Sequence, residues 1–484
     1  MSGTQTTGHD APPDFKRSAA IALANARLGA AMDAATRRQD TGRRTMMPEL
    51  GDPMATRNLG ARIKDHTLQN LDRYLAQLAD NVSRSGGKVH FASDAEQARR
   101  IIADIARQAG VQHIVKSKSM ASEEIHLNTA LEAAGFEVAE TDLGEYILQI
   151  AGEAPSHIVT PVLHRNREDI GRLFADKLGI EYTTDPPTLT AHARRILREK
   201  FKAADMGITG ANFAVAETGT ICIVTNEGNG RFTTSRPRVL VTLMGMEKVI
   251  PRMCDLTVFL KLLSKSATGQ RMTCYTNLVT GPRRSGDADG PEEFHLVIID
   301  YGRSNILRDP RYREVLRCIR CGACLNACPV YRKIGGHAYE SVYPGPIGKV
   351  ITPLLRSLPM YKDLPNASSL CEACYEACPM RINLPQMLLN LRNDQLKAGK
   401  SPLTWRLGFK GWRIGMSSKL LYRMGSMMGR LFMSLLARDG WVRRMPAPPA
   451  SVWTGYRDLP VLAKRPFHKR WPDLQRELNR EGKP

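Results

Sequence analysis

The stretch CIRCGACLNACP, residues 318–329, is the most informative motif in the second half of the chain. Its cysteines follow the spacing Cys-x2-Cys-x2-Cys-x3-Cys-Pro, which is typical of proteins with two iron–sulfur clusters. The first three thiolates of such a run bind one cluster, and the fourth lies too far along the chain and binds the other. Zinc sites usually pair two Cys-x2-Cys arms, a pattern that fits this run poorly. The run therefore predicts iron–sulfur ligation.

A second run, ASSLCEACYEACPM at residues 367–380, has one cysteine fewer. When the two runs are aligned by their Cys-x3-Cys-Pro ends, Ser368 falls at the position of Cys318. Crosswise exchange of ligands then predicts a first cluster, [4Fe–4S], held by Cys318, Cys321, Cys324 and Cys378. The predicted ligands of a second cluster are Cys328, Cys371 and Cys374. That cluster is either [3Fe–4S] or [4Fe–4S], and in the second case its fourth ligand is a non-cysteine group such as Ser368, Ser369 or a solvent oxygen.

The other candidate ligands are weaker. His337 lies in the Gly- and Tyr-rich segment between the runs, where a single histidine is more often a hydrogen-bonding residue than a ligand. We expect this segment to pack around the clusters and shield them. The three remaining cysteines, Cys222, Cys254 and Cys274, are expected to be small buried residues.

Upstream of the first run, short apolar segments alternate with helical patterns. Strands are predicted at residues 88–92, 111–117, 136–142, 221–226, 238–245 and 294–300. Strands interleaved with helices indicate an α/β domain with a largely parallel sheet. Helical spacing also predicts one N-terminal helix over residues 15–38 and a second that ends at the glycine pair 86–87.

These patterns divide the chain into five segments. We expect a disordered tail at 1–12, N-terminal helices at 13–84 and the α/β domain at 85–302. An all-α helical ferredoxin module is predicted at 303–399, and a helical basic extension at 400–484. At 484 residues the chain is long enough for about three domains.

Two polar loops of the α/β domain are candidate ligand sites. The loop NEGNGR can present backbone N–H groups and a guanidinium to an anion, and its residues are Asn226, Glu227, Gly228, Asn229, Gly230 and Arg231. The alternative interpretation is a β-turn, because Asn and Gly suit positive φ. Lys116 to Ser119 follow a strand and could line a carboxylate pocket, although a solvated loop explains them as well. Neither Gly-x-Gly-x-x-Gly nor a Walker sequence occurs.

The net charge of +21 is concentrated at the C-terminal end, where residues 401–484 hold 17 Lys and Arg against 5 Asp and Glu. All five tryptophans lie there too. Apolar residues from 405 to 435 recur at helical spacing and predict one amphipathic helix with a basic flank. Such a helix could dock on a partner subunit or on anionic lipid, or could pack on its own module, and nucleic-acid binding is disfavoured. Neither an export signal nor a spanning segment is evident, so the expected location is cytoplasmic, with a peripheral position on the inner membrane face left open.

With both cysteine runs in view, the chain resembles the lactate-utilisation iron–sulfur protein B (LutB, LldF or YkgF) family. The resemblance covers almost all of the chain from about residue 15. It includes CIRCGACLNACPVYRKIGGHAYESVYPGPIGKVITPLL and ASSLCEACYEACPMRINLP. In the upstream domain it is carried by VKSKSMASEEIHLN, PSHIVTPVLHRNR, AETGTICIVTNEGNGR, MGMEKVIP and YTNLVTGPRR.

The resemblance implies an electron-transfer component of a three-protein complex that oxidises L-lactate to pyruvate. Its partners would be A-type and C-type lactate-utilisation proteins, and its acceptor a membrane quinone or another carrier. The α/β domain would have the ribose-5-phosphate isomerase/CoA-transferase type of fold. Two alternatives remain: an electron-transfer subunit of another dehydrogenase, for glycolate or glycerol 3-phosphate, and a small-acid-binding α/β protein with redox-sensing clusters.

Overall fold

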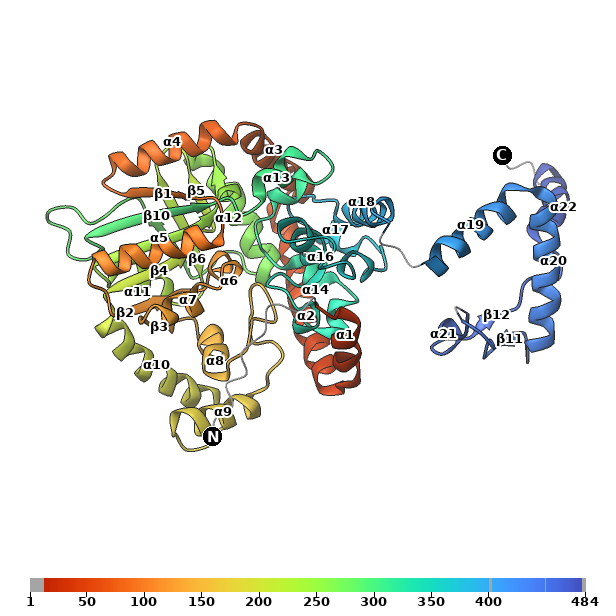
Figure 1. Cartoon of the computed structure of the whole chain (residues 1–484), viewed down its shortest axis with the longest axis horizontal. Coiled ribbons are helices and arrows are strands. Elements are labelled where there is room, and N and C mark those ends of the chain that lie inside the picture. Colours follow the sequence, from red (N-terminus) through yellow and green to blue (C-terminus); the bar gives the residue numbers. More distant parts are fainter. Residues whose placement is uncertain (1–12, 400–402, 449, 481–484) are drawn as a thin grey trace. The chain divides into compact units, whose positions relative to one another are not determined.

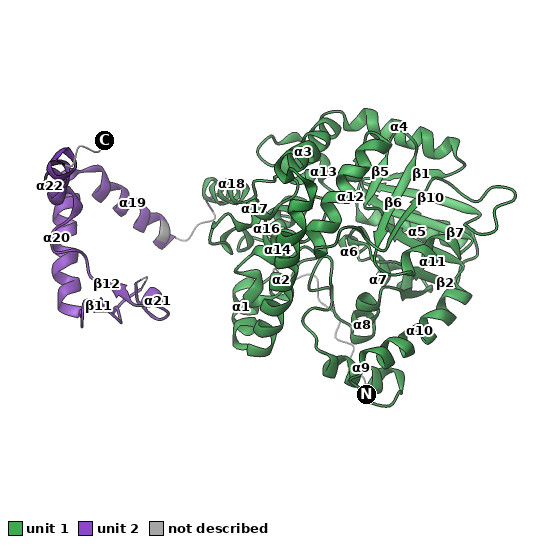
Figure 2. Cartoon of the chain, turned by 180° about the vertical axis from the view of Figure 1, so that it is seen from behind, with its two compact units in different colours: residues 1–398 green, residues 399–484 purple. Residues whose placement is uncertain are grey.

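The computed structural model describes residues 13–399, 403–448 and 450–480, so the predicted disordered tail at 1–12 lies outside the described residues. The chain divides into two compact units, Met1–Ala398 and Gly399–Pro484 (Figure 2). The first unit contains the six-stranded and four-stranded sheets and both cysteine runs, and the second is mainly helical with one two-stranded sheet.

Six parallel strands form the central sheet, in the order β1-β10-β7-β4-β2-β3 (Figure 1). Their bounds are β1 (Lys88–Ala92), β2 (His113–Lys116), β3 (Glu137–Glu140), β4 (Met206–Gly210), β7 (Val239–Gly245) and β10 (Glu293–Ile299). Every neighbouring pair is parallel, which confirms the predicted α/β class. All of β7 is buried, as expected for a central strand that is covered on both faces.

The two faces of this sheet support different cores because successive side chains of a strand point in opposite directions. Val241 and Leu243 of β7 pack in a core with α5 (Ala95–Gln108) and α7 (Leu127–Ala133). Leu240 and Met244 pack in another core with α4 (Leu71–Arg84) and the second sheet. The remaining helices of this region are α6 (Met120–Glu124), α8 (Leu143–Ala151), α9 (Arg167–Leu178), α10 (Pro186–Ala203), α11 (Asn229–Ser235) and α12 (Met253–Thr268).

A second sheet of four strands has the order β8-β5-β6-β9. Its strands are β5 (Phe213–Val215), β6 (Thr220–Thr225), β8 (Val249–Ile250) and β9 (Tyr275–Val279). The predicted strand at 221–226 is β6, which pairs antiparallel with β5 and β9 and is not part of the parallel sheet. Its apolar run was read correctly as a strand, but strand pattern alone does not specify the partner.

The N-terminal segment is broken more often than the sequence predicts. Residues 15–38 form α1 (Phe15–Ala24) and the start of α2 (Ala26–Met46), because the side chain of Asn25 accepts the Leu28 N–H and caps a new helix. The second predicted helix is divided at Asn70 into α3 (Pro53–Gln69) and α4. Between α2 and α3 lies a 3-10 turn, η1 (Met47–Leu50).

The cysteine runs lie among short helices, as predicted for a helical ferredoxin module. These are α13 (Arg303–Arg308), α14 (Ala323–Ala327), α15 (Tyr331–Ile334), α16 (Gly345–Leu355), α17 (Ala373–Ala377) and α18 (Leu384–Lys397). The 3-10 turns are η2 (Met246–Lys248), η3 (Arg313–Arg317), η4 (His337–Tyr339) and η5 (Leu364–Asn366). One large core joins this module to α2 and α12, so the module packs directly on the α/β region.

The C-terminal unit contains α19 (Leu403–Ser417), α20 (Lys419–Leu436), β11 (Trp441–Val442), α21 (Ala450–Thr454), β12 (Leu459–Pro460) and α22 (Phe467–Arg480). The single amphipathic helix predicted over 405–435 is wrong, because Ser418 accepts the Leu421 N–H and starts a new helix. Large apolar side chains on both helices are more than half exposed, among them Leu407, Trp412, Leu420, Met427 and Leu431. Within the described ranges, no helix combines the length and apolarity that a membrane crossing requires.

Candidate iron–sulfur sites and an adjoining cavity

The two cysteine runs have the same backbone conformation. Arg320 and Leu370, which occupy equivalent positions, have φ of 60° and 54°, and Gly322 and Glu372 have φ of 75° and 64°. After these residues come the five-residue helices α14 and α17, which end at Cys328 and Cys378 with extended backbone. Left-handed φ is costly for arginine, leucine and glutamate, so the repeated conformation indicates a shared requirement of the two runs.

Ser368 in the second run has the same local hydrogen bonding as Cys318 in the first run. The Arg320 N–H donates to Cys318 Sγ at 3.4 Å, and the Leu370 N–H donates to Ser368 Oγ at 3.2 Å. The alignment of the two runs at Ser368 therefore has a direct counterpart in the local hydrogen bonding.

The seven cysteines of the runs line two cavities. One is lined by Cys318, Cys321, Cys324 and Cys378, and the other by Cys328, Cys371 and Cys374 together with Ser368 and Ser369. Each cavity draws its cysteines from both runs, and α14 packs against α17. Among the residues that the structure describes, no group of three or more His, Cys, Asp or Glu could hold a single metal ion.

The donor set and its surroundings fit two iron–sulfur clusters. Burial raises the pKa of the Cys378 thiol to about 11 and that of Cys374 to about 12, so these thiols ionise only against compensating positive charge such as iron. The Ile382 N–H donates to Cys378 Sγ at 3.4 Å, and Lys349 Nζ donates to Cys328 Sγ at 3.8 Å. Donors of this kind suit sulfide and thiolate acceptors.

A third and larger cavity, of about 330 Å³, lies against the first cysteine-lined cavity, and Arg320 and Ile158 line both. Four residues of the predicted loop line it, Asn226, Glu227, Asn229 and Gly230. Gly228 precedes α11 and is outside the lining, and Arg231 forms an ion pair with Asp289 at 3.6 Å.

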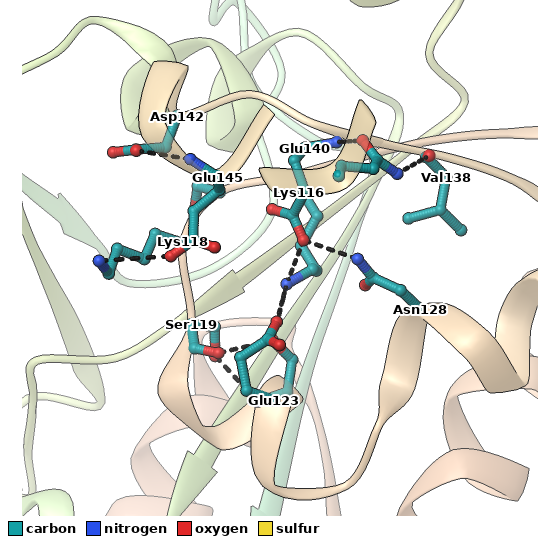
Figure 3. Close-up of polar contacts among 12 residues, drawn as sticks. Lys116, Lys118, Ser119, Glu123, Asn128, Val138, Glu140, Asp142 and Glu145 are labelled. Atoms are coloured by element: carbon teal, nitrogen blue, oxygen red, sulfur yellow. Dashed lines mark hydrogen bonds and ion pairs between the residues drawn. The ribbon is translucent and has the colours of Figure 1, made fainter. Parts of the chain in front are cut away.

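Of the predicted Lys116–Ser119 segment, three residues line the large cavity and one does not. Ser117, Lys118 and Ser119 line the large cavity, whereas Lys116 is buried and pairs with Glu140 at 2.7 Å and Glu123 at 3.1 Å (Figure 3). Lys118 lies 3.3 Å from Glu145, whose pKa burial raises to about 7. Lys116 is therefore structural in this fold.

Buried ion pairs join the α/β region to the cysteine module. Arg303 donates to Glu247 at 2.6 Å and to Glu124 at 2.8 Å, and Arg320 donates to Glu247 at 3.3 Å. Burial opposes the ionisation of Glu247, but Arg303 and Arg320 lower its pKa to about 2. Tyr343, from the segment between the runs, donates to Glu124. These contacts hold the first cysteine run against the carboxyl ends of the strands.

The remaining predicted residues have other roles. His337 shares a short hydrogen bond of 2.7 Å with the Ala154 carbonyl and lines neither cysteine cavity. Tyr331, Tyr339 and Tyr343 are buried, in agreement with a shielding role for their segment. The three isolated cysteines were expected to be buried. This is confirmed for Cys222 and wrong for Cys254 and Cys274, which are exposed.

Sequence reasoning missed the charged residues around the cysteines, chiefly Arg320, Lys349 and Lys248. Arg320 lies between two cysteines of the first run, and this position could have indicated a charged group beside the cysteines. Lys349 lies in a nearly apolar helix, α16, where a lone lysine is rarely fully buried without a partner.

Three family models match the chain: LUD domain at residues 75–299, 4Fe-4S dicluster domain at 314–382, and Lactate utilisation protein B, C-terminal at 392–475. A crystal structure of a DUF162 family protein from Deinococcus radiodurans covers 47% of this chain and 98% of its own length, with a TM-score of 0.28 and 13% identity.

Relatives match over nearly the whole chain. Lactate utilization protein B of Bacillus licheniformis is 48% identical, covering 96% of this chain and 97% of the relative. The protein of that name from Bacillus subtilis is 47% identical, covering 95% of this chain and 96% of the relative. Similarity of this extent confirms the resemblance drawn from the cysteine runs and the upstream motifs. The chain belongs to the lactate utilisation protein B family.

Proposed function

We propose that this chain is the iron–sulfur electron-transfer component of a multi-protein complex that oxidises L-lactate to pyruvate. The observation that carries the proposal is the pair of neighbouring cysteine-lined cavities, each drawing ligands from both runs. The names of the relatives support the substrate. Two bound clusters would supply two one-electron carriers, while the protein supplies their thiolates and the buried groups that set their potentials.

For the first cavity we propose a [4Fe–4S] cluster held by Cys318, Cys321, Cys324 and Cys378. For the second we propose a [4Fe–4S] cluster held by Cys328, Cys371 and Cys374, with Ser368 Oγ as the fourth ligand. The equivalent N–H contacts at Cys318 Sγ and Ser368 Oγ support this choice over a [3Fe–4S] cluster or a solvent ligand. An alkoxide is a harder ligand than a thiolate, so the second cluster would be the more easily altered of the two.

The proposed partners are the A-type and C-type lactate-utilisation proteins and a quinone-linked or other downstream acceptor, and nucleic acid is not among them. The exposed apolar side chains of α19 and α20, flanked by Arg406, Lys410, Arg413 and Arg423, support a docking role for the C-terminal unit. A partner protein or the inner membrane surface would cover them.

The test begins with full-length protein purified without oxygen. Iron and sulfide counts and electron paramagnetic resonance (EPR) are expected to indicate two clusters that dithionite reduces. With the A-type and C-type proteins added, L-lactate is expected to reduce both clusters, whereas glycolate and glycerol 3-phosphate are not. Clusters that dithionite reduces but lactate with both partners does not would contradict the proposal.

A further inference from the structure

The large cavity lies at the place in the central sheet where open α/β folds bind ligands. The chain runs from β2 outward to β3 and then returns to β4 on the other side of β2, so the strand order reverses between β2 and β4. Ser117 to Ser119 follow β2, and Ala211 and Asn212 follow β4; all of them line the cavity. Ligands of open α/β sheets bind outside the carboxyl ends of the strands at such a reversal.

The opposite side of the cavity is formed by the cysteine module. Arg320 of the first run and Tyr343 of the segment between the runs line it, and the Arg320 guanidinium lies 4.7 Å from the centre of the Tyr343 ring. Arg320 also lines the first cysteine-lined cavity. Ile158 lines both cavities too, so a molecule in the large cavity would lie beside the first predicted cluster, across Arg320 and Ile158.

The charges of the lining favour an anion on the module side. Glu124 and Glu247 both accept from Arg303, and Glu247 also accepts from Arg320 Nη2 at 3.3 Å. The Nε and Nη1 donors of Arg320 are buried and have no hydrogen-bond partner in the described ranges. Lys248, half-buried in the same lining, has its pKa lowered by burial to about 8, so an anionic neighbour would favour its charged form.

Two carboxyl groups, Asp142 and Glu227, and Lys118 line the cavity as well. Asp142 is occupied in capping α8, where it accepts the Gly144 and Glu145 N–H groups. Glu227 accepts the Leu143 N–H at 3.3 Å, and burial together with Asp142 raises its pKa to about 7. Apolar side chains complete the lining: Ile158, Val159, Ile223, Leu243, Met244 and Leu263.

We propose that this cavity binds a small carboxylic acid of the 2-hydroxy or 2-oxo class, with its carboxylate against Arg320 and Lys248. The choice of this class rests on the proposed function, whereas the anionic group is inferred from the lining. The acid binds next to the first cluster, and its charge makes that cluster harder to reduce. The second cluster has no residue in common with this cavity and is unaffected.

Calorimetric titration of the full-length protein, purified without oxygen, tests the proposal with four probes: L-lactate, pyruvate, propionate and inorganic phosphate. Lactate and pyruvate are expected to bind, propionate more weakly and phosphate not at all. Lys248→Met keeps the length and packing of the side chain and is expected to weaken lactate binding about tenfold, the loss of one charged contact. Lys261→Met removes an exposed lysine of α12 outside the cavity and is expected to bind lactate normally.

A second measurement locates the bound acid. Potentiometric EPR with saturating lactate is expected to lower the midpoint potential of the first cluster and leave that of the second unchanged. Absence of lactate and pyruvate binding, equal binding by Lys248→Met, equal binding of phosphate, or equal shifts of both clusters would each overturn the proposal. Both clusters must be present and reducible by dithionite in every sample. Loss of binding in such samples contradicts the cavity assignment alone, whereas absent clusters contradict the proposed function.

Discussion

At the scale of single residues, Ser368 is the position that distinguishes the two predicted clusters. Its Oγ accepts the Leu370 N–H in the way that Cys318 Sγ accepts the Arg320 N–H. The backbone conformation of the two runs is the same around these positions, so at this point of the run the two differ by oxygen in place of sulfur. Substitutions there test the proposed ligand role of Ser368.

Ser368→Ala is expected to convert the second cluster to a three-iron form, because the fourth iron loses its protein ligand. Iron content would fall by about one atom per chain, and an oxidised [3Fe–4S] EPR signal would appear. Ser369→Ala, beside it, is the matched control and is expected to keep the original signal. Identical spectra for Ser368→Ala and the unmodified protein would exclude Ser368 as a ligand.

Cys378→Ala tests the crosswise arrangement. Because Cys378 lines the first cavity, its loss is expected to damage the first cluster and spare the second, although Cys378 belongs to the second run. Cys371→Ala is expected to have the opposite effect, as Cys371 lines the second cavity. EPR of the two variants distinguishes these outcomes, and damage to the second cluster by Cys378→Ala would refute the exchange of ligands between runs.

Lys349 is expected to raise the midpoint potential of the second cluster. It is 1% exposed and donates to Cys328 Sγ, and a buried cation favours the more negative, reduced cluster. A charged contact of about 1.5 kcal/mol corresponds to roughly 60 mV for one electron, so Lys349→Met is expected to lower the potential by about that amount. Potentiometric EPR measures it, with exposed Lys333→Met as control. An unchanged potential in Lys349→Met would show that the contact has no such effect.

Glu145 makes the protein less stable as pH rises. Its pKa is raised to about 7 from an ordinary value of 4.5, so between these values the folded state holds more protons than the unfolded state and stability falls as pH increases. Glu145→Gln removes this pH dependence. The free energy of unfolding of the variant is expected to exceed that of the unmodified protein by a margin that grows from pH 5.5 to 8.5 and reaches roughly 2–3 kcal/mol. Thermal unfolding at the two pH values measures the change. Glu96→Gln, at an exposed ion pair, is the control, and a gap that does not widen with pH would contradict the prediction.

At the scale of elements, helix ends explain where the sequence-based reading failed. Asn25 and Ser418 interrupt continuous apolar patterns, and each caps the helix that follows through its side chain. Hydrophobic spacing continues across such residues, because the helices on either side each carry an apolar stripe. Attention to capping residues would have found these two breaks.

Strand β4 was missed for a different reason. Its sequence, MGITG, contains two glycines, which are unusual inside strands. Packing explains Gly207, because a Cβ there would lie 2.0 Å from the Thr233 carbonyl oxygen of α11. Close packing of α11 on the sheet thus requires glycine at position 207, and glycine weakens the sequence pattern by which a strand is predicted.

The junction of α2 with the end of α12 is expected to be equally intolerant of side chains. Gly269 has φ of 68°, and a Cβ on it would lie 2.6 Å from the Gly42 Cα. Gly269→Ala therefore combines backbone strain with a backbone clash and is expected to cost about 3 kcal/mol. Gly110→Ala, with φ of 62° and no atom within 4 Å of the added carbon, is expected to cost about 1 kcal/mol. Thermal unfolding of both variants checks the difference, and equal losses would contradict a clash at this junction.

At the scale of the whole molecule, the separate parts of the chain could be predicted from its sequence. The cysteine spacing predicted iron–sulfur ligation and the pairing of the runs, and alternating apolar segments predicted an α/β domain with a parallel sheet. These features can be read from sequence because they depend on local spacing: the reach of a ligand run, or the two faces of a strand. The placement of Ser368 opposite Cys318 followed from the same spacing.

How these parts meet depends on tertiary packing. Packing in one core brings Arg320, from within a cysteine run, to the carboxyl ends of strands that lie more than 70 residues earlier in the chain. Because Arg320, Lys349 and Glu145 are buried, the free energy of each charged side chain depends on neighbours that are distant in sequence. A sequence pattern carries no record of such neighbours, because long-range contacts and desolvation arise only when the chain is compact.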